Sequence, residues 1–450
     1  MKHHHNIGES TQRELTRPRR NQLPDSERVG ILQGKLYRKA KLEPAFKFYV
    51  LYDKMFIPYM LRQAWKQVKQ KAGSPGIDGV TIADIEASGI DQYLQQLGEQ
   101  LRTKTYKPKA VKRVMIPKAN GGQRPLGIPT VKDRIVQTVC KMILEPIFEA
   151  DFKDCSYGFR PNRSAHHAMA MIKENLTKGN TQILDADLSS YFDTIPHDKL
   201  MTALKLRIAD PRMLQLIKMW LKCPVFENGR YKGGNKQKMG TPQGGVISPL
   251  LANLYMHLLD RIVSNTTSLF NQHGVKMIRY ADDFILMGKT IPPDILQKLK
   301  QLLDRMGLTL NETKTKLVNA TTQPFDFLGF TVRYSKDLYG RNKKYWEIFS
   351  SKKSQKKLRE RIGEFLSKAN HYAPEKVSEG LNAIIRGWLN YFDVPALTYM
   401  RIPRRALRKY LSTTLYRYYN RKSQRKTKLY RQKAFEVLTT KYGLIDPYYS

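Results

Sequence analysis

The sequence predicts an α+β fold, with strands and helices in the first 350 residues and helices alone in the last 100. Strand-like apolar runs at 111–128 and at 275–287 are each broken by a short polar turn, a pattern typical of β-hairpins. Beyond residue 350, apolar side chains recur at helical spacing in three stripes. Because 41% of the 450 residues are hydrophobic, the chain has enough apolar surface for the cores of two or three domains.

The charge balance predicts a polyanionic partner. The chain has 79 Lys and Arg against 39 Asp and Glu, a formal net charge of +40, and an isoelectric point near 10.0. A ribosomal or membrane-surface protein would also be basic, but a mean hydropathy of −0.53 and the lack of a long apolar run disfavour the membrane. Residues 1–6 lack the apolar core of a secretory signal, and the three cysteines lack disulfide or zinc spacing. A reduced, cytoplasmic setting is therefore expected.

The N-terminal part is expected to contain a basic arm, a helix and a basic hairpin. Residues 1–40 are polar and basic and are expected to form a flexible or weakly helical arm. Apolar positions between about 55 and 70 recur at helical spacing. The hairpin predicted at 111–128 places Lys118 and Arg124 near its tip, where cations would bind the triphosphate of a nucleotide. A basic hairpin surrounded by solvent is the alternative.

Acidic side chains gather in two strand-like segments. Asp282 and Asp283 form the turn of the second hairpin, although an isolated pair would suit an ordinary turn because Asp is common there. The run at 183–188 adds Asp185 and Asp187, and spacing does not choose between them because residues i and i+2 share a face. Three aspartates on two strands would hold two Mg²⁺ ions about 3.5–4 Å apart, the arrangement used for in-line phosphoryl transfer.

Three motifs resemble, in order, the central motifs of reverse transcriptases: DLSSYFD at 187–193, GTPQGGVISP at 240–249 and YADD at 280–283. Further motifs resemble one branch, the reverse transcriptase/maturases encoded by bacterial group II introns. They are GSPGIDG at 73–79, RPLGIP at 124–129, YGFRP at 157–161, FLGF at 327–330 and GWLNYF at 387–392. Because so many motifs keep their order, the resemblance is specific, and it extends from about residue 60 to about residue 395.

The resemblance implies a right-hand polymerase with four regions. A basic N-terminal arm at 1–40 would precede mixed α/β fingers at 41–165. The palm, at 166–345, would combine an antiparallel sheet with helices and carry the catalytic carboxylates. An α-helical thumb and maturase domain with a basic tail would occupy 350–450. The implied enzyme is an RNA-directed DNA polymerase, a nucleotidyltransferase.

The resemblance also assigns the catalytic and metal-binding aspartates. It selects Asp187 rather than Asp185 as the metal ligand of the first acidic strand and leaves Asp185 a supporting role. Asp187 and Asp282 would bind both Mg²⁺ ions, and Asp283 would support the second. Mn²⁺ is a possible substitute for Mg²⁺.

A nucleotide pocket follows from the same resemblance. Its expected members are Lys118 and Arg124 on the triphosphate, Phe192 against the 2′ position of the sugar, Gln243 and Gly244 along the template and nucleotide, and Lys314 as the acid for the leaving pyrophosphate. An aromatic side chain at the 2′ position excludes the hydroxyl by which RNA and DNA building blocks differ. The alternatives are a plain core role for Phe192 and simple surface charge for Lys314.

The basic C-terminal region is expected to bind RNA. Residues 351–450 carry 23 Lys and Arg against 7 Asp and Glu, so +16 of the net charge lies there. The expected phosphate contacts, which weaken with added salt, are Arg404, Arg405, Arg408, Lys409, Arg421, Lys422 and Arg425. Interleaved tyrosines would stack on bases, while Trp388 is expected in the core. A merely solvated basic face is the alternative.

The implied function is that of a group II intron reverse transcriptase that also acts as a maturase, binding intron RNA and assisting splicing and retromobility. The implied partners are the intron RNA, an RNA template with a DNA or RNA primer, target DNA and dNTPs, with no membrane. The expected location is the bacterial cytoplasm, in ribonucleoproteins near the nucleoid. A nuclease domain containing Cys and His is not expected, because the last such residues are Cys223 and His371.

Two alternatives to intron mobility are considered. A reverse transcriptase recruited to host defence or DNA repair would keep the same catalytic residues. An RNA-binding splicing factor without polymerase activity would be free to lose them, so the intact Asp187, Asp282 and Asp283 argue against it.

Overall fold

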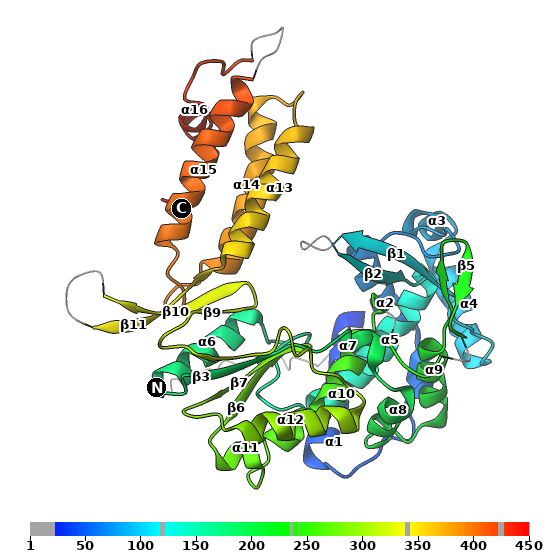
Figure 1. Ribbon diagram of the computed structural model, residues 1–450. Helices are drawn as coiled ribbons and strands as arrows, with labels where there is room; N and C mark the ends of the chain where they lie inside the picture. The colour runs from blue at the N-terminus through cyan, green and yellow to red at the C-terminus, as the bar shows by residue number, and fades with distance from the viewer. Residues whose placement is uncertain are drawn as a thin grey trace, which may run out of the picture.

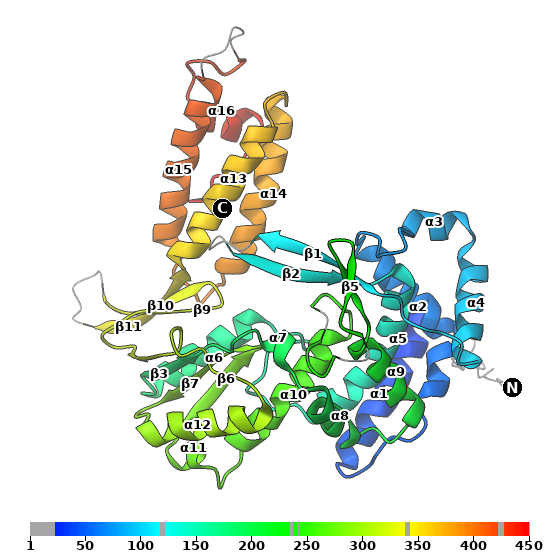
Figure 2. The same ribbon diagram turned by 45° about the vertical axis from the view of Figure 1, so that its right-hand side comes forward.

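In the computed structural model, the bundle of C-terminal helices and the β-hairpin of residues 111–128 both rise above the sheet that contains residues 182–186 and 276–288 (Figures 1 and 2). The structure describes residues 23–117, 122–234, 237–241, 243–337, 343–421 and 427–449. Lys118, Lys422 and Arg425, three of the predicted site residues, lie outside these ranges. Within them, no helix has both the length and the apolar character that a membrane crossing requires.

The fingers are built from helices around α5 (Val131–Glu149) and from one small sheet. The other helices are α1 (Asp25–Leu42), η2 (Tyr52–Phe56), α2 (Pro58–Gln70), α3 (Ile82–Ala87) and α4 (Ile90–Arg102). The predicted hairpin is confirmed as β1 (Val111–Pro117) paired antiparallel with β2 (Gln123–Ile128). Strands β4 (Val225–Glu227) and β5 (Arg230–Lys232) extend this sheet in the order β2-β1-β4-β5.

Helix α1 corrects the expected N-terminal arm. Four apolar residues spaced at three or four positions bury one face of α1, namely Val29, Leu32, Leu36 and Ala40. Gln33 Nε2 on the same helix donates to the carbonyl of Met142 in α5 at 3.0 Å. From Asp25 onward the chain is therefore a regular helix packed on α5, and not a flexible arm.

The palm is an antiparallel four-stranded sheet with helices on it, as predicted. Its strands are β3 (Gln182–Ala186), β6 (Lys276–Tyr280), β7 (Asp283–Gly288) and β8 (Lys316–Asn319), in the order β6-β7-β3-β8. Its helices are α6 (Ala165–Thr177), α7 (Tyr191–Thr194), α8 (His197–Lys205), α9 (Pro211–Leu221), α10 (Ser248–Val263), α11 (Leu269–Gln272) and α12 (Pro293–Met306).

The palm sheet separates two hydrophobic cores because successive side chains on a strand point to opposite faces. On β7, Phe284 and Leu286 belong to a core shared with the fingers, whereas Ile285 and Met287 belong to a core shared with the thumb. Strand β3 divides in the same way. Both faces of these two strands are therefore packed against a core.

The thumb is helical, as predicted, and stands on a third sheet. Strands β9 (Phe325–Phe327), β10 (Phe330–Lys336) and β11 (Lys344–Ser350) form that sheet. The helices are α13 (Lys352–Lys368), α14 (Pro374–Phe392), α15 (Arg401–Tyr419) and α16 (Ala434–Lys441). Trp388 lies buried in the core of the thumb, which confirms the expectation for its ring.

A pair of matched substitutions tests the role of α1. Leu36→Ala should lower the free energy of unfolding by about 2–5 kcal/mol, because Leu36 is buried and its loss leaves a cavity. Leu42→Ala on the same helix should change it by less than about 0.5 kcal/mol, because that side chain is 79% exposed. Urea unfolding measures both. Equal effects of the two substitutions would contradict the placement of α1 in the fingers.

Candidate active site

The predicted hairpin is confirmed, but its turn lies one residue earlier than expected, so that Asp283 is the first residue of β7. Strands β6 and β7 pair with Tyr280 opposite Asp283, which leaves Ala281 and Asp282 as a two-residue turn. Ala281 has a φ of 60°, in the left-handed region that residues other than glycine rarely adopt. The tip therefore presents two adjacent carboxylates on a tightly constrained turn.

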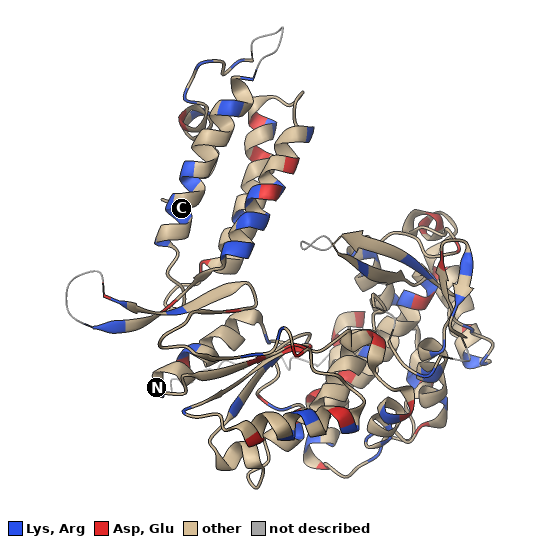
Figure 3. Ribbon diagram, in the orientation of Figure 1, with Lys and Arg blue, Asp and Glu red and all other residues tan. Residues whose placement is uncertain are grey.

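The pairing of β3 with β7 brings the third aspartate to this tip. Ala186 lies opposite Phe284 in the antiparallel register, and one further step along both strands places Asp187 opposite Asp283. The backbone carbonyl of Asp187 accepts a hydrogen bond from the amide of Asn311 at 2.8 Å. Figure 3 shows acidic positions gathered where β3 ends and β7 begins. The three aspartates thus lie at adjoining strand ends, with Asp187 directly after β3, Asp282 in the turn and Asp283 at the start of β7.

The carboxylates perturb one another. Desolvation raises the pKa of Asp282, the charge of Asp187 adds to the rise, and Arg124 and Arg279 oppose it. Desolvation, followed by the charges of the other carboxylates, raises the pKa of Asp283 to about 6. Negative charge is therefore concentrated at the tip beyond what the protein's own cations offset, a condition that favours binding of a cation.

The donor chemistry fits Mg²⁺, although the described side chains are not yet arranged as a metal cage. Among the residues that the structure describes, no three His, Cys, Asp or Glu side chains are close enough together to hold a metal. The ligands on offer are carboxylate oxygens, which Mg²⁺ prefers. Lys314 Nζ lies 3.1 Å from Asp187 Oδ2, so an ammonium group already occupies one cationic position at the cluster.

Two residues predicted for the nucleotide pocket lie together. Arg124 Nε on β2 donates to Gln243 Oε1 at 3.1 Å, and Gln243 Nε2 lies 3.4 Å from Asp193 Oδ2.

Phe192 in α7 is buried, and its ring meets that of Tyr191 edge-on at 5.5 Å between centroids. Its ring is thus part of the core, while its carbonyl accepts a hydrogen bond from the Thr241 amide at 2.7 Å.

Gly244 is required by contact with the fingers. Its φ is 112°, and a Cβ placed there would lie 2.2 Å from the carbonyl oxygen of Gly127 in β2. The close approach seen is therefore to protein backbone, whereas the sequence suggested approach to a nucleic acid. Gly244 also lines a cavity of about 850 Å³ together with Arg134 and Phe159, an exposed aromatic residue.

Gly158 and Arg279 support the hairpin tip, and the sequence analysis assigned neither of them this role. A Cβ on Gly158, part of the YGFRP motif, would lie 2.4 Å from the amide nitrogen of Ala281. Arg279, just before the tip, is fully buried. The only sequence signals were a glycine inside a motif and a cation that follows two apolar residues in a strand.

The basic residues predicted on α15 have different surroundings. Arg404 forms an ion pair with Asp393, and Arg408 Nε lies 2.7 Å from Asp446 Oδ2. Among the described residues, Arg405 and Lys409 are exposed and have no carboxylate partner. Figure 3 shows basic positions spaced along this helix. The outward cations therefore alternate with cations that also serve the fold.

Arg421, at the end of the same region, contacts the α13–α14 connection. Its Nη1 donates to Asn370 Oδ1, and its guanidinium lies 4.9 Å from the ring centroid of Tyr418. Part of its donor capacity is therefore already used within the protein.

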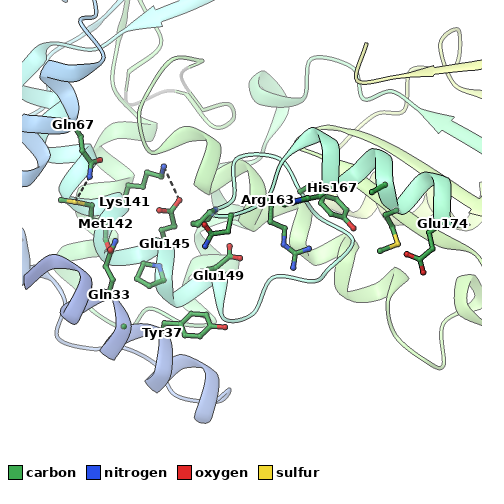
Figure 4. A pocket seen from close by; sticks show the side chains of 17 residues that line it. Gln33, Tyr37, Gln67, Lys141, Met142, Glu145, Glu149, Arg163, His167 and Glu174 are labelled. Carbon is green, nitrogen blue, oxygen red and sulfur yellow. Dashed lines mark hydrogen bonds and ion pairs between the residues drawn. The ribbon is translucent and has the colours of Figure 1, made fainter. Parts of the chain in front are cut away.

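A cavity of about 1090 Å³ lies between α1, α5 and α6, away from these residues. Figure 4 shows side chains from the three helices around it, among them Tyr37, Glu145, Glu149 and His167. None of the predicted site residues lines it. It therefore forms no part of the carboxylate site.

Two family models match the chain in the order of palm and thumb. Residues 116–332 match reverse transcriptase (RNA-dependent DNA polymerase), and residues 355–435 match the group II intron maturase-specific domain. The first match confirms the expected polymerase fold. It covers every described carboxylate and nucleotide-pocket residue discussed above, and the second covers α15.

Curated relatives agree with these matches. Protein YkfC of Escherichia coli is 34% identical over 348 residues, which cover 69% of this chain and 90% of YkfC. The group II intron-encoded protein LtrA of Lactococcus lactis is 32% identical over 314 residues, covering 56% of this chain and 52% of LtrA. An uncharacterized 91 kDa protein in a cob intron of Schizosaccharomyces pombe is 31% identical, covering 61% of this chain and 40% of that protein.

The chain spans nearly all of YkfC but only about half, or less, of the two intron-encoded relatives. The order of the two matched domains and the level of identity nevertheless agree with the motifs. This chain belongs to the group II intron-encoded reverse transcriptase/maturases, a family of RNA-directed DNA polymerases.

Proposed function

We propose that Asp187, Asp282 and Asp283 hold two Mg²⁺ ions and that the chain extends a DNA or RNA primer with dNTPs along an RNA template. The observation that carries the proposal is the β3–β7 register, which sets Asp187 against the tip of the β6–β7 hairpin. The raised pKa of Asp283 supports it, because crowded carboxylates become favourable once cations lie among them. Mn²⁺, with the same preference for oxygen ligands, is a possible substitute.

The residues around the cluster divide the remaining work. Bound Mg²⁺ supplies activation of the primer 3′-hydroxyl and neutralisation of the triphosphate. Arg124, whose charge already acts on Asp282, binds the triphosphate, and Lys118, which follows β1 in the sequence, is assigned to the same group. Lys314, whose Nζ lies 3.1 Å from Asp187 Oδ2, would donate a proton to the leaving pyrophosphate.

Nucleotide choice and template placement fall to neighbouring residues. Phe192, held in the core beside the Gln243 loop, limits space at the 2′ position and thereby favours dNTPs. Gln243 and Gly244 border the template and nucleotide. The exposed ring of Phe159, in the cavity beside Gly244, offers a surface on which a template base stacks.

The thumb binds the intron RNA in this proposal. Arg405 and Lys409 contact phosphates directly, with Arg404, Arg408 and Arg421 beside them. Lys422 and Arg425 continue the basic sequence. Through this surface the chain assists splicing and then uses target DNA for retromobility, in ribonucleoproteins near the bacterial nucleoid. The match to the maturase-specific domain and the likeness to LtrA support this part.

Primer extension on a generic RNA template with Mg²⁺ and dNTPs tests the polymerase site. Asp282→Asn should lower the rate of nucleotide addition by more than about 100-fold, because it removes a proposed metal ligand. Asp304→Asn, an exposed aspartate on α12, is the matched control and should extend primers as the wild type does. Equal activity of the Asp282→Asn variant and the wild type would refute the proposed role of this carboxylate.

Salt-dependent binding to a short RNA hairpin tests the thumb surface. Arg405→Gln should weaken binding and reduce the slope of log affinity against log salt by about 1, because one phosphate contact is lost. Arg102→Gln on α4 of the fingers, where Arg102 pairs with Glu99, serves as the control and should leave the slope unchanged. An unchanged slope in the Arg405 variant would remove this side chain from the RNA interface.

A further inference from the structure

Arg279 is a fully buried cation directly before the catalytic tip. It lies in β6, where Met277 and Ile278 before it point into the two cores. Its side chain is 0% exposed, as is that of Asp260 on α10. A cation completely removed from water is costly unless its hydrogen bonds are satisfied, so its partners indicate its role.

The guanidinium joins α10 to the tip. Arg279 Nε and Nη2 donate to the two carboxylate oxygens of Asp260 at 2.8 and 2.5 Å. Its Nη1 donates to the backbone carbonyl of Ala281 at 2.7 Å and to Asn253 Oδ1 at 3.0 Å. One planar group is thus fixed by two residues of α10 and holds the carbonyl of the first turn residue.

The turn that Arg279 holds is one that would not adopt its shape unaided. Ala281 is in the left-handed conformation, which is unfavourable for alanine and persists only where the surroundings impose it. From the other side, Gly158 packs against the Ala281 amide, and Asn253 Nδ2 donates to the Gly158 carbonyl at 2.7 Å. Asn253 therefore links the two supports of Ala281, one at its amide and one at its carbonyl.

We propose that Arg279 is a positioning residue that fixes the Ala281 carbonyl and so sets the direction in which Asp282 and Asp283 present their carboxylates, with Asp260 and Asn253 as its anchors on α10. This inference rests on the proposed role of those carboxylates in binding metal. A buried ion pair contributes little to stability by itself, whereas one that holds a strained turn contributes geometry.

The experiment compares full-length Arg279→Met and Arg279→Lys with a matched control, Arg207→Met. Arg207 is also a buried arginine with an acidic partner, Asp151, and its donors go to the carbonyls of Ala40, Glu43, Pro44 and Phe46, none of them at the tip. Three quantities are measured: amide hydrogen exchange across 276–288, Mn²⁺ binding by paramagnetic resonance, and the rate of nucleotide addition per folded molecule.

Arg279→Met should speed exchange at the tip but not elsewhere, weaken Mn²⁺ binding by about 10-fold, and lower the rate of nucleotide addition by about 100-fold, with primer–template affinity unchanged. Arg279→Lys should give values of tip exchange, Mn²⁺ affinity and nucleotide-addition rate between those of Arg279→Met and the wild type. Arg207→Met should lower thermal stability while leaving tip exchange and the rate per folded molecule as in the wild type. If Arg279→Met does not fold, Asn253→Ala should show the same pattern more weakly.

Unchanged tip exchange and an unchanged rate per folded molecule in the Arg279→Met or the Asn253→Ala variant would overturn the proposal and leave a purely structural arginine. The proposed function fails separately. If the wild type does not extend primers, the exchange measurement still decides whether Arg279 positions the tip.

Discussion

The antiparallel register of β3 against β7 is the constraint on which the site depends. A slip of one residue would turn Asp187 to the opposite face of the sheet and away from Asp283. Packing opposes that slip, because it would exchange Leu184 and Ile183 between the two cores and would turn the partly exposed Asp185 toward the core shared with the fingers. The apolar residues of the palm therefore determine where its carboxylates lie.

The carboxylates themselves oppose this arrangement. Desolvation and mutual repulsion raise the pKa of Asp185 and of Asp283 to about 6, so the fold holds negative charge that would be more stable apart. Nearby cations offset part of this negative charge. Lys314 contacts Asp187, and Arg124 and Arg279 lower the pKa of Asp282. A fold that concentrates negative charge in this way is suited to binding metal ions. In our proposal, the buried Arg279 holds the strained turn at Ala281 in place.

The sequence predicted those elements that a local pattern of apolar and polar residues determines. The acidic hairpin could be recognised because apolar runs flank a two-residue turn, and the helical thumb because its apolar stripes keep one period. Helix α1 was missed because polar and basic residues dominate its composition and conceal the stripe from Val29 to Ala40. The resemblance, not spacing, chose Asp187 over Asp185.

Long-range contacts account for the remaining differences. Gly244 contacts the backbone of Gly127, more than a hundred residues earlier. Only the folded chain therefore shows that the missing side chain leaves room for this backbone. Arg408 pairs with Asp446 beyond the end of its own helix, which composition does not indicate. Arg279 is one of two cations in β6, and its role depends on Asp260 and Asn253 being brought beside the tip by α10.

The most direct test of the account is to locate the metal ions. Crystals of the protein with an RNA template, a primer lacking its 3′-hydroxyl, a matching dNTP and Mn²⁺ would reveal the ions by anomalous scattering. The account predicts two peaks about 3.5–4 Å apart, both in contact with Asp187 and Asp282 and the second near Asp283. Peaks bound to Asp185 instead, or no peak at the hairpin tip with nucleotide bound, would contradict it.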